Sequence, residues 1–184
     1  VGWVVKKPSN LSSLEAMSIG TAGLTAAASV LKITESSVES ELPVLVSGST
    51  GGVGSISVML LSKLGKQVSA LTGKDSSVNF LESIGATNVL MRKEYLETPA
   101  KALERPLFSS AIDTVGGDVL SKMLPQISPH GVVACCGNVA GIEVHTTVFP
   151  FILRGVTLAG IDSAESPLEF KTSLWNKLSD EWNL

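Results

Sequence analysis

The sequence predicts an α/β fold: a doubly wound parallel sheet of about six strands with helices on both faces. Strand-like and helix-like segments alternate about every 20 to 25 residues, which favours a parallel sheet. The first strand-like run is apolar throughout, as expected of a strand buried on both faces. A glycine-rich loop joins that run to an amphipathic segment. With right-handed crossovers, these observations predict a Rossmann-type sheet with strand order 3-2-1-4-5-6.

The composition fits one globular domain and excludes several classes of protein. The 184 residues are 44% hydrophobic and carry a net charge of only −3, so disorder is not expected. A pI near 5.4 argues against a nucleic-acid partner. Cys135 and Cys136 are adjacent, which excludes a disulfide framework and a four-ligand zinc site. No uninterrupted apolar run reaches about 18 residues, so no membrane partner is expected. A reducing, cytoplasmic compartment is expected instead.

Local patterns predict each element in turn. An Ala- and Leu-rich stretch predicts a helix over 18–33, and the apolar run 43–47 predicts the buried strand. Apolar residues at helical spacing predict a helix over 55–63, which Gly65 should end. The later elements are expected as a strand at 67–71, a helix from Asp75 to about 84 capped by Asp75 or Ser76, strands at 88–91 and 110–115, a helix through 119–127, a strand at 131–136, a helical turn at 150–154, a strand at 156–161 and a helix at 168–182.

The most informative motif is the run Gly-Ser-Thr-Gly-Gly-Val-Gly at 48–54, between the predicted strand and helix. This context predicts dinucleotide binding; the alternative is a tight turn without a ligand. Gly48 and Gly51 are expected to adopt backbone angles closed to other residues. Gly52 should let the main chain approach a pyrophosphate, and Gly54 should let the helix pack close to the strand. The phosphates would then meet the helix N-terminus.

The end of the second strand favours NADP(H) over NAD. An NAD site has an acidic residue there for the ribose, whereas this chain has Thr72, Gly73 and Lys74. A hydroxyl and a cation would attract a 2′-phosphate. Asp75 could instead be the ribose acid, although it fits a helix cap better. Arg92, at the end of the third strand, either adds charge near the adenine or is a plain surface residue.

Segments after the later strands are candidates for the nicotinamide half of the cofactor. In the segment 113–117, Gly116 and Gly117 would let the ribose and nicotinamide half pass close, whereas Asp113 fits turn chemistry better than ligand contact. The backbone of Gly137 and Asn138 could face the nicotinamide ribose, with the preceding cysteines as core thiols. The apolar turn 149–154 either borders the nicotinamide or is purely structural.

Catalytic and metal-binding residues are not identifiable in this sequence. The two histidines, His130 and His145, have no Cys or Glu partner at metal-ligand spacing, so no metal is expected. Hydride transfer needs no such group, because the cofactor carries that chemistry.

Four segments together resemble the medium-chain dehydrogenase/reductase superfamily: GTAGLTA at 20–26, GSTGGVG at 48–54, AIDTVG at 111–116 and PFILRGVTLAGIDS at 150–163. Within it, they are most similar to the zinc-independent quinone oxidoreductase branch and its acrylyl-CoA reductase subgroup. The resemblance covers nearly the whole chain. The last segment is specific to the subgroup, whereas the glycine loop is not.

This resemblance implies an NADPH-dependent enzyme that adds hydride to an activated C=C bond of an enoyl or acrylyl thioester. A quinone reductase is the alternative. The implied cofactor contacts are Gly51, Gly52, Val53 and Gly54 for the pyrophosphate, Thr72, Gly73 and Lys74 for the 2′-phosphate, Arg92 near the adenosine, and Thr25, Asn138 and Leu153 near the nicotinamide. The family often has Ser-Gly-Arg where this chain has Thr72-Gly73-Lys74.

The resemblance also implies a division of the chain. Residues 1–17 would lead from a GroES-like catalytic domain, 18–163 would form the NADP-binding domain, and 164–184 would lead back toward the catalytic domain. Most contacts with the small-molecule substrate would then lie outside this chain. The sixth strand, 156–161, could pair two copies, as it does in the family. A non-catalytic Rossmann module that binds partners is the competing hypothesis, and a zinc alcohol dehydrogenase is disfavoured.

Overall fold

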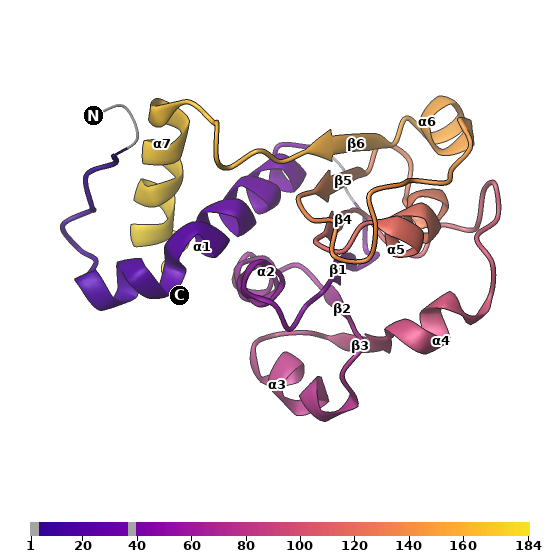
Figure 1. Ribbon diagram of the computed structural model, residues 1–184, viewed down its shortest axis with the longest axis horizontal. Helices are drawn as coiled ribbons and strands as arrows, with labels where there is room; N and C mark the ends of the chain where they lie inside the picture. The colour runs from indigo at the N-terminus through magenta and orange to yellow at the C-terminus, as the bar shows by residue number, and fades with distance from the viewer. Residues whose placement is uncertain (1–3, 37–39) are drawn as a thin grey trace.

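A six-stranded parallel sheet organises the protein. The computed structural model describes residues 4–36 and 40–184. In this part of the chain the strand order is β3-β2-β1-β4-β5-β6, which runs from bottom to top in Figure 1. This order confirms the predicted 3-2-1-4-5-6 arrangement and the Rossmann-type fold. The strands are β1 (Val44–Ser47), β2 (Val68–Thr72), β3 (Asn88–Met91), β4 (Ala111–Asp113), β5 (Val132–Cys135) and β6 (Thr157–Gly160).

Helices cover both faces of the sheet, as predicted. The first face packs against α1 (Ser13–Thr34), α2 (Gly52–Lys63), α3 (Val78–Ser83) and, by way of α1, α7 (Leu168–Ser179). The second face packs against α4 (Arg92–Glu97), α5 (Gly117–Met123) and the short helix η2 (Leu124–Gln126). In Figure 1 α1, α2 and α7 lie on one side of the column of strands, with α5 and α6 (Phe149–Arg154) on the other.

The strands separate two hydrophobic cores by alternation. Val44 and Val46 of β1 face the core under α1 and α2, whereas Leu45 between them faces the core under α5. Burial on both faces explains why β1 is apolar at each of these positions.

Helix α1 differs most from its prediction. It begins at Ser13, five residues before the expected start, because Ser12 and Glu15 form a reciprocal capping box. Gly20 interrupts it with non-helical angles (φ 51°, ψ −154°). The turns before this bend are largely exposed; Met17, for example, is 80% exposed. The prediction rested on the Ala- and Leu-rich stretch that begins at Ser18, so it missed this first part of the helix.

By length and mean hydropathy, α1 is the one described helix that could cross a membrane, although it contains no uninterrupted apolar run of that length. Half of its most apolar 18-residue window is buried inside the structure, and core helices of soluble proteins pass the same test. The helix is therefore weak evidence for a membrane span.

Other helix ends show where local signals succeed and fail. Gly65 (φ 73°) ends α2 as predicted. Its N–H donates to the Ser62 carbonyl, and the Lys66 N–H donates to the Leu61 carbonyl. The capping role expected of Asp75 is wrong. Asp75 instead begins the short helix η1 (Asp75–Ser77), which has no side-chain cap, and α3 follows it. Helix α4 was not predicted, so Arg92 begins a helix as well as following β3.

Candidate functional site

The glycine loop between β1 and α2 is held by close backbone contacts. Gly48 has a left-handed φ of 58°, as expected, and its carbonyl accepts a hydrogen bond of 2.9 Å from the Gly51 N–H. A Cβ at Gly54 would lie 2.3 Å from the Gly48 carbonyl oxygen, so only glycine lets α2 approach the loop. The expectation for Gly51 is wrong: its φ of −81° and ψ of 170° suit any residue. A Cβ at Gly52 would meet Ala22 of α1 at 3.0 Å.

The N-terminus of α2 can receive an anion. The first hydrogen bond onto the helix runs from the Ser55 N–H to the Gly51 carbonyl. The N–H groups of Gly52, Val53 and Gly54 therefore precede it and have no intrahelical partner. No side chain caps this end, and the first turn contains no acidic residue. Free N–H groups and the helix dipole together favour a phosphate at this position.

A buried carboxylate ties the loop to β4. The Ser47 hydroxyl donates to Asp113 Oδ1 at 2.6 Å and accepts from the Thr114 N–H at 2.9 Å. Thr114 Oγ1 donates to the Ser47 carbonyl, and the Gly116 N–H donates to Asp113 Oδ2, each at 2.9 Å. Burial raises the pKa of Asp113, although these hydrogen bonds oppose the shift. Asp113 therefore serves turn chemistry, as expected.

A pocket of about 300 Å³ opens beside this loop at the carboxyl ends of β1, β2 and β4. It brings together five of the predicted cofactor residues. Its lining consists of Gly48, Thr50, Gly51, Leu71, Thr72, Gly73, Lys74, Arg92, Thr114, Val115, Val119 and Val139. None of these lining residues is acidic, so the pocket carries the positive charge of Lys74 and Arg92 alone.

The cationic corner of this pocket, defined as Thr72, Gly73, Lys74 and Arg92, is arranged by two contacts. The Thr72 hydroxyl accepts a hydrogen bond of 3.1 Å from the Lys74 N–H. The Arg92 guanidinium lies against Gly73, close enough that a Cβ there would be 2.9 Å from Nη2. Both cations are on exposed residues, so an anion could reach them from solvent.

The residues predicted for the nicotinamide half lie in different surroundings. Gly137 packs against the turn after β4, where a Cβ would be 2.1 Å from the Thr114 carbonyl oxygen. Asn138 is exposed, and its carbonyl accepts from the Gly141 N–H. Thr25 is buried in α1, and its hydroxyl bonds to Ser163, beyond the carboxyl end of β6, at 2.6 Å. These residues therefore border the carboxyl edge of the sheet without lining the pocket.

Leu153 does not join the others within this chain, contrary to expectation. It lies in α6, which leads into the amino end of β6, and it is 61% exposed. Next to it, the Arg154 carbonyl accepts from the His130 N–H, just before β5. This is the edge of the sheet opposite the glycine loop.

Sequence reasoning missed several residues that line or support the pocket. Thr114 and Val115 lie in the segment after β4 that the rule of carboxyl strand ends had indicated, but neither was predicted as a cofactor contact. Val139 is 89% exposed on the loop after β5, and no local pattern marks it. Ser47 reads as an ordinary strand residue until its contact with Asp113 is known.

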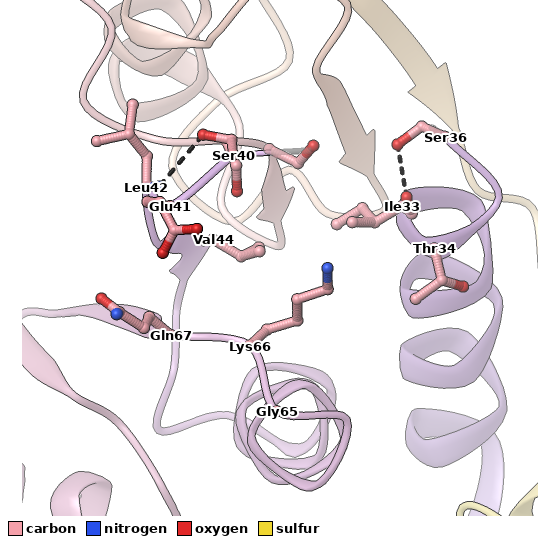
Figure 2. Close-up of a pocket in the computed structure, with 12 residues that line it drawn as sticks. Ile33, Thr34, Ser36, Ser40, Glu41, Leu42, Val44, Gly65, Lys66 and Gln67 are labelled. Carbon is pink, nitrogen blue, oxygen red and sulfur yellow. Dashed lines mark hydrogen bonds between the residues drawn. The ribbon is translucent and has the colours of Figure 1, made fainter. Parts of the chain in front are cut away.

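Other hollows lie apart from the pocket. One of about 710 Å³, mainly apolar, lies between residues 5–7, the bend at Gly20 and α7, and Ser163 is in its wall. Another, of about 290 Å³, lies at the amino ends of β1 and β2, where Lys66 and Gln67 line it (Figure 2). It occupies the edge opposite the glycine loop and shares no residue with the pocket beside that loop.

Metal-binding and nucleophilic groups are sparse. Within residues 4–36 and 40–184, no three His, Cys, Asp or Glu side chains gather closely enough to hold a metal ion. The His145 imidazole lies 3.4 Å from the Glu143 carboxylate on the surface. Burial raises the pKa of both thiols, that of Cys136 to about 11, so neither ionises readily near neutral pH.

The family described as zinc-binding dehydrogenase matches residues 52–180. A probable acrylyl-CoA reductase of Escherichia coli is 44% identical over 177 residues, which are 96% of this chain and 54% of that protein. A candidate quinone oxidoreductase of Bacillus subtilis is 43% identical over 180 residues, 97% of this chain and 54% of that protein. The chain thus spans about half the length of these relatives.

Solved structures agree with the fold and contain nucleotides. An oxidoreductase of Salmonella enterica in complex with NADP is 43% identical and superimposes with a TM-score of 0.93 over 98% of this chain and 56% of its own. A Bacillus subtilis protein with NAD bound is 42% identical and has a TM-score of 0.95 over 99% of this chain and 56% of its own. NADP(H) is thus a cofactor that suits this fold.

Proposed function

Because the chain belongs to the zinc-binding dehydrogenase family, we propose that it is the cofactor-binding part of an NADPH-dependent oxidoreductase. The observation that carries this proposal is the cationic corner. At the end of β2, where an NAD site has a carboxylate, this chain has Lys74, with Arg92 beside it and no acidic residue lining the pocket.

The pocket and the α2 N-terminus divide the cofactor between them in this proposal. The N–H groups of Gly52, Val53 and Gly54 bind the pyrophosphate, and Lys74 and Arg92 bind the 2′-phosphate. The Thr72 hydroxyl orients Lys74 by accepting a hydrogen bond from the Lys74 backbone N–H. The nicotinamide half extends along the carboxyl edge past Gly137 and Asn138, toward Thr25. Bound cofactor supplies the hydride.

The proposal includes no zinc step. Although the family is described as zinc-binding, the described residues contain no group of three suitable ligands. The charge available to a ligand in the pocket is that of the cationic corner.

For the substrate, we infer an activated C=C bond in a small enoyl thioester. The name of the Escherichia coli relative supports this class, and that of the Bacillus subtilis relative supports a quinone as the alternative. The apolar hollow near Ser163 could admit either, because its wall adjoins Thr25 and hence the nicotinamide side. Residues 1–17 and 164–184 would connect this domain, 18–163, with a catalytic domain.

A homodimer through the edge of β6 belongs to the same proposal. Among the described strands, β6 has a neighbour on one side only, and Leu158 on it is partly exposed. The adjacent helix α6 exposes Phe149, Ile152 and Leu153. Pairing of two edges would bury these apolar side chains. A cytoplasmic location fits the two free cysteines.

Calorimetric titration of this chain with NADPH and with NADH tests the cofactor assignment. We expect NADPH to bind about tenfold more tightly or better, and Lys74→Ala to remove most of that preference. Lys93→Ala, which removes an exposed charge outside the pocket, is the matched control and should keep the preference. If the unaltered chain binds neither nucleotide, the alternative of a non-catalytic Rossmann module is favoured.

A further inference from the structure

We propose that Gly73 sets the nucleotide preference of this chain by seating the Arg92 guanidinium, and that it does not itself need to touch the cofactor. Gly73 is thus a positioning residue. This inference rests on the proposed function, because it concerns the 2′-phosphate corner of the same pocket.

The sheet brings the two residues together. β2 and β3 are parallel neighbours, and their register pairs Thr72 with Met91. Gly73 and Arg92 are the next residues on each chain segment, so they leave the sheet side by side. The guanidinium then lies over the space that a side chain at position 73 would occupy. A Cβ there would be 2.9 Å from Nη2, 3.1 Å from Cζ and 3.3 Å from Nε of Arg92.

Backbone geometry does not explain a glycine at position 73. Its φ is outside the left-handed region, in contrast to Gly48, Gly65 and Gly85, so another residue could adopt the same backbone. The three nearest atoms to its Cβ position all belong to Arg92. What glycine provides here is room for the planar group.

The same contact predicts a selective effect of substitution. The end of an arginine side chain is flexible, so a methyl group at position 73 would displace the guanidinium without straining the sheet. Arginine recognises phosphate through a planar fork whose hydrogen bonds depend on its position. Displacement should therefore weaken recognition of the 2′-phosphate, while the pyrophosphate site at Gly52–Gly54 stays intact.

The experiment measures binding of 2′,5′-ADP and of ADP, which differ in the 2′-phosphate, to the unaltered chain and to Gly73→Ala. We expect Gly73→Ala to weaken 2′,5′-ADP about tenfold and to change ADP less than about twofold. The melting temperature should stay unchanged. Gly160→Ala is the matched control: a Cβ there meets nothing within 4 Å, so both affinities should remain as they are.

A double-mutant cycle identifies Arg92 as the intermediary. If Gly73 acts through Arg92, then Gly73→Ala should have no further effect on 2′,5′-ADP binding in an Arg92→Ala background. If the losses of 2′,5′-ADP affinity from Gly73→Ala and from Arg92→Ala multiply independently, the proposal is overturned. A parallel loss of ADP binding in Gly73→Ala would also overturn it. Either result means direct contact between Gly73 and the nucleotide. An unaltered chain that does not prefer 2′,5′-ADP contradicts the proposed function itself. Unchanged preference in Gly73→Ala contradicts only this inference.

Discussion

The glycine loop and the cationic corner are adjacent parts of one pocket, yet they are built differently. The loop is assembled from backbone: Gly54 contacts the Gly48 carbonyl, and Asp113 on the neighbouring strand β4 accepts a hydrogen bond from Ser47. The corner is assembled from the exposed side chains of Lys74 and Arg92 on neighbouring strand ends. Changes in the loop should therefore affect folding, whereas changes in the corner should affect the choice of ligand.

This difference has a physical basis. Backbone atoms in a packed turn cannot move away from a new side chain, so a clash there shifts whole elements. The end of a surface side chain can rotate away at little cost. One pocket can then combine a phosphate site that the fold requires with a specificity site that can vary independently.

The largest expected effect is that of Gly54→Ala. Its methyl group would lie 2.3 Å from the Gly48 oxygen, so α2 must move away from β1. We expect the free energy of unfolding to fall by about 3 kcal/mol or more in urea titrations. Gly160→Ala, in open space, should lose less than about 0.5 kcal/mol. Equal stability of the two variants would contradict the view that backbone packing fixes the loop.

Removal of the buried carboxylate should have the next largest effect. Asp113→Ala leaves the Ser47 hydroxyl and the Gly116 N–H without their buried acceptor. Unsatisfied buried donors should lower the free energy of unfolding by about 3 kcal/mol. Asp162→Ala is a matched control, because Asp162 accepts from two turn N–H groups on the surface and should cost about 1 kcal/mol or less. Similar losses in both variants would indicate that burial of this network does not matter.

An effect of intermediate size is expected from salt, which should weaken ligand binding at the cationic corner and leave the packing of the loop unchanged. Lys74 and Arg92 are exposed, so dissolved ions screen their attraction for a 2′-phosphate. We expect the ratio of NADPH to NADH affinity to fall about threefold as KCl rises from about 0.05 to 0.5 M. The melting temperature measured alongside should change little. A ratio that is independent of salt would mean that the preference does not arise from these exposed charges.

The smallest expected effect is a gain in stability from Ser57→Ala, on α2 one turn beyond the loop. Ser57 Oγ is buried and has no hydrogen-bond partner among the described residues. Replacing it should raise the free energy of unfolding by up to about 1 kcal/mol. Ser55→Ala on the same helix brings the same helix propensity but removes a hydrogen bond to Gly52, so it should gain less. A loss on Ser57→Ala would show that the hydroxyl has a role in packing.

The candidate site was predictable in part, and the two regions again differ. The glycine loop was recognisable because its spacing and its strand–turn–helix context are local in sequence. Thr72, Gly73 and Lys74 were recognisable from their distance after that loop. The contact of Arg92 with Gly73 was not, because it depends on the register between β2 and β3. The same holds for Val139, which reaches the pocket from the loop after β5.

The sequence by itself determined the sheet order and the end of α2 at Gly65, since hydrophobic alternation, turn glycines and crossover handedness act locally. Tertiary structure alone decided which side chains meet. It moved Leu153 to the opposite edge of the sheet, assigned Asp113 to Ser47, and placed Arg92 over Gly73. These pairings join residues that are distant in the chain, and only the packing of parallel strands and their loops brings their atoms into contact.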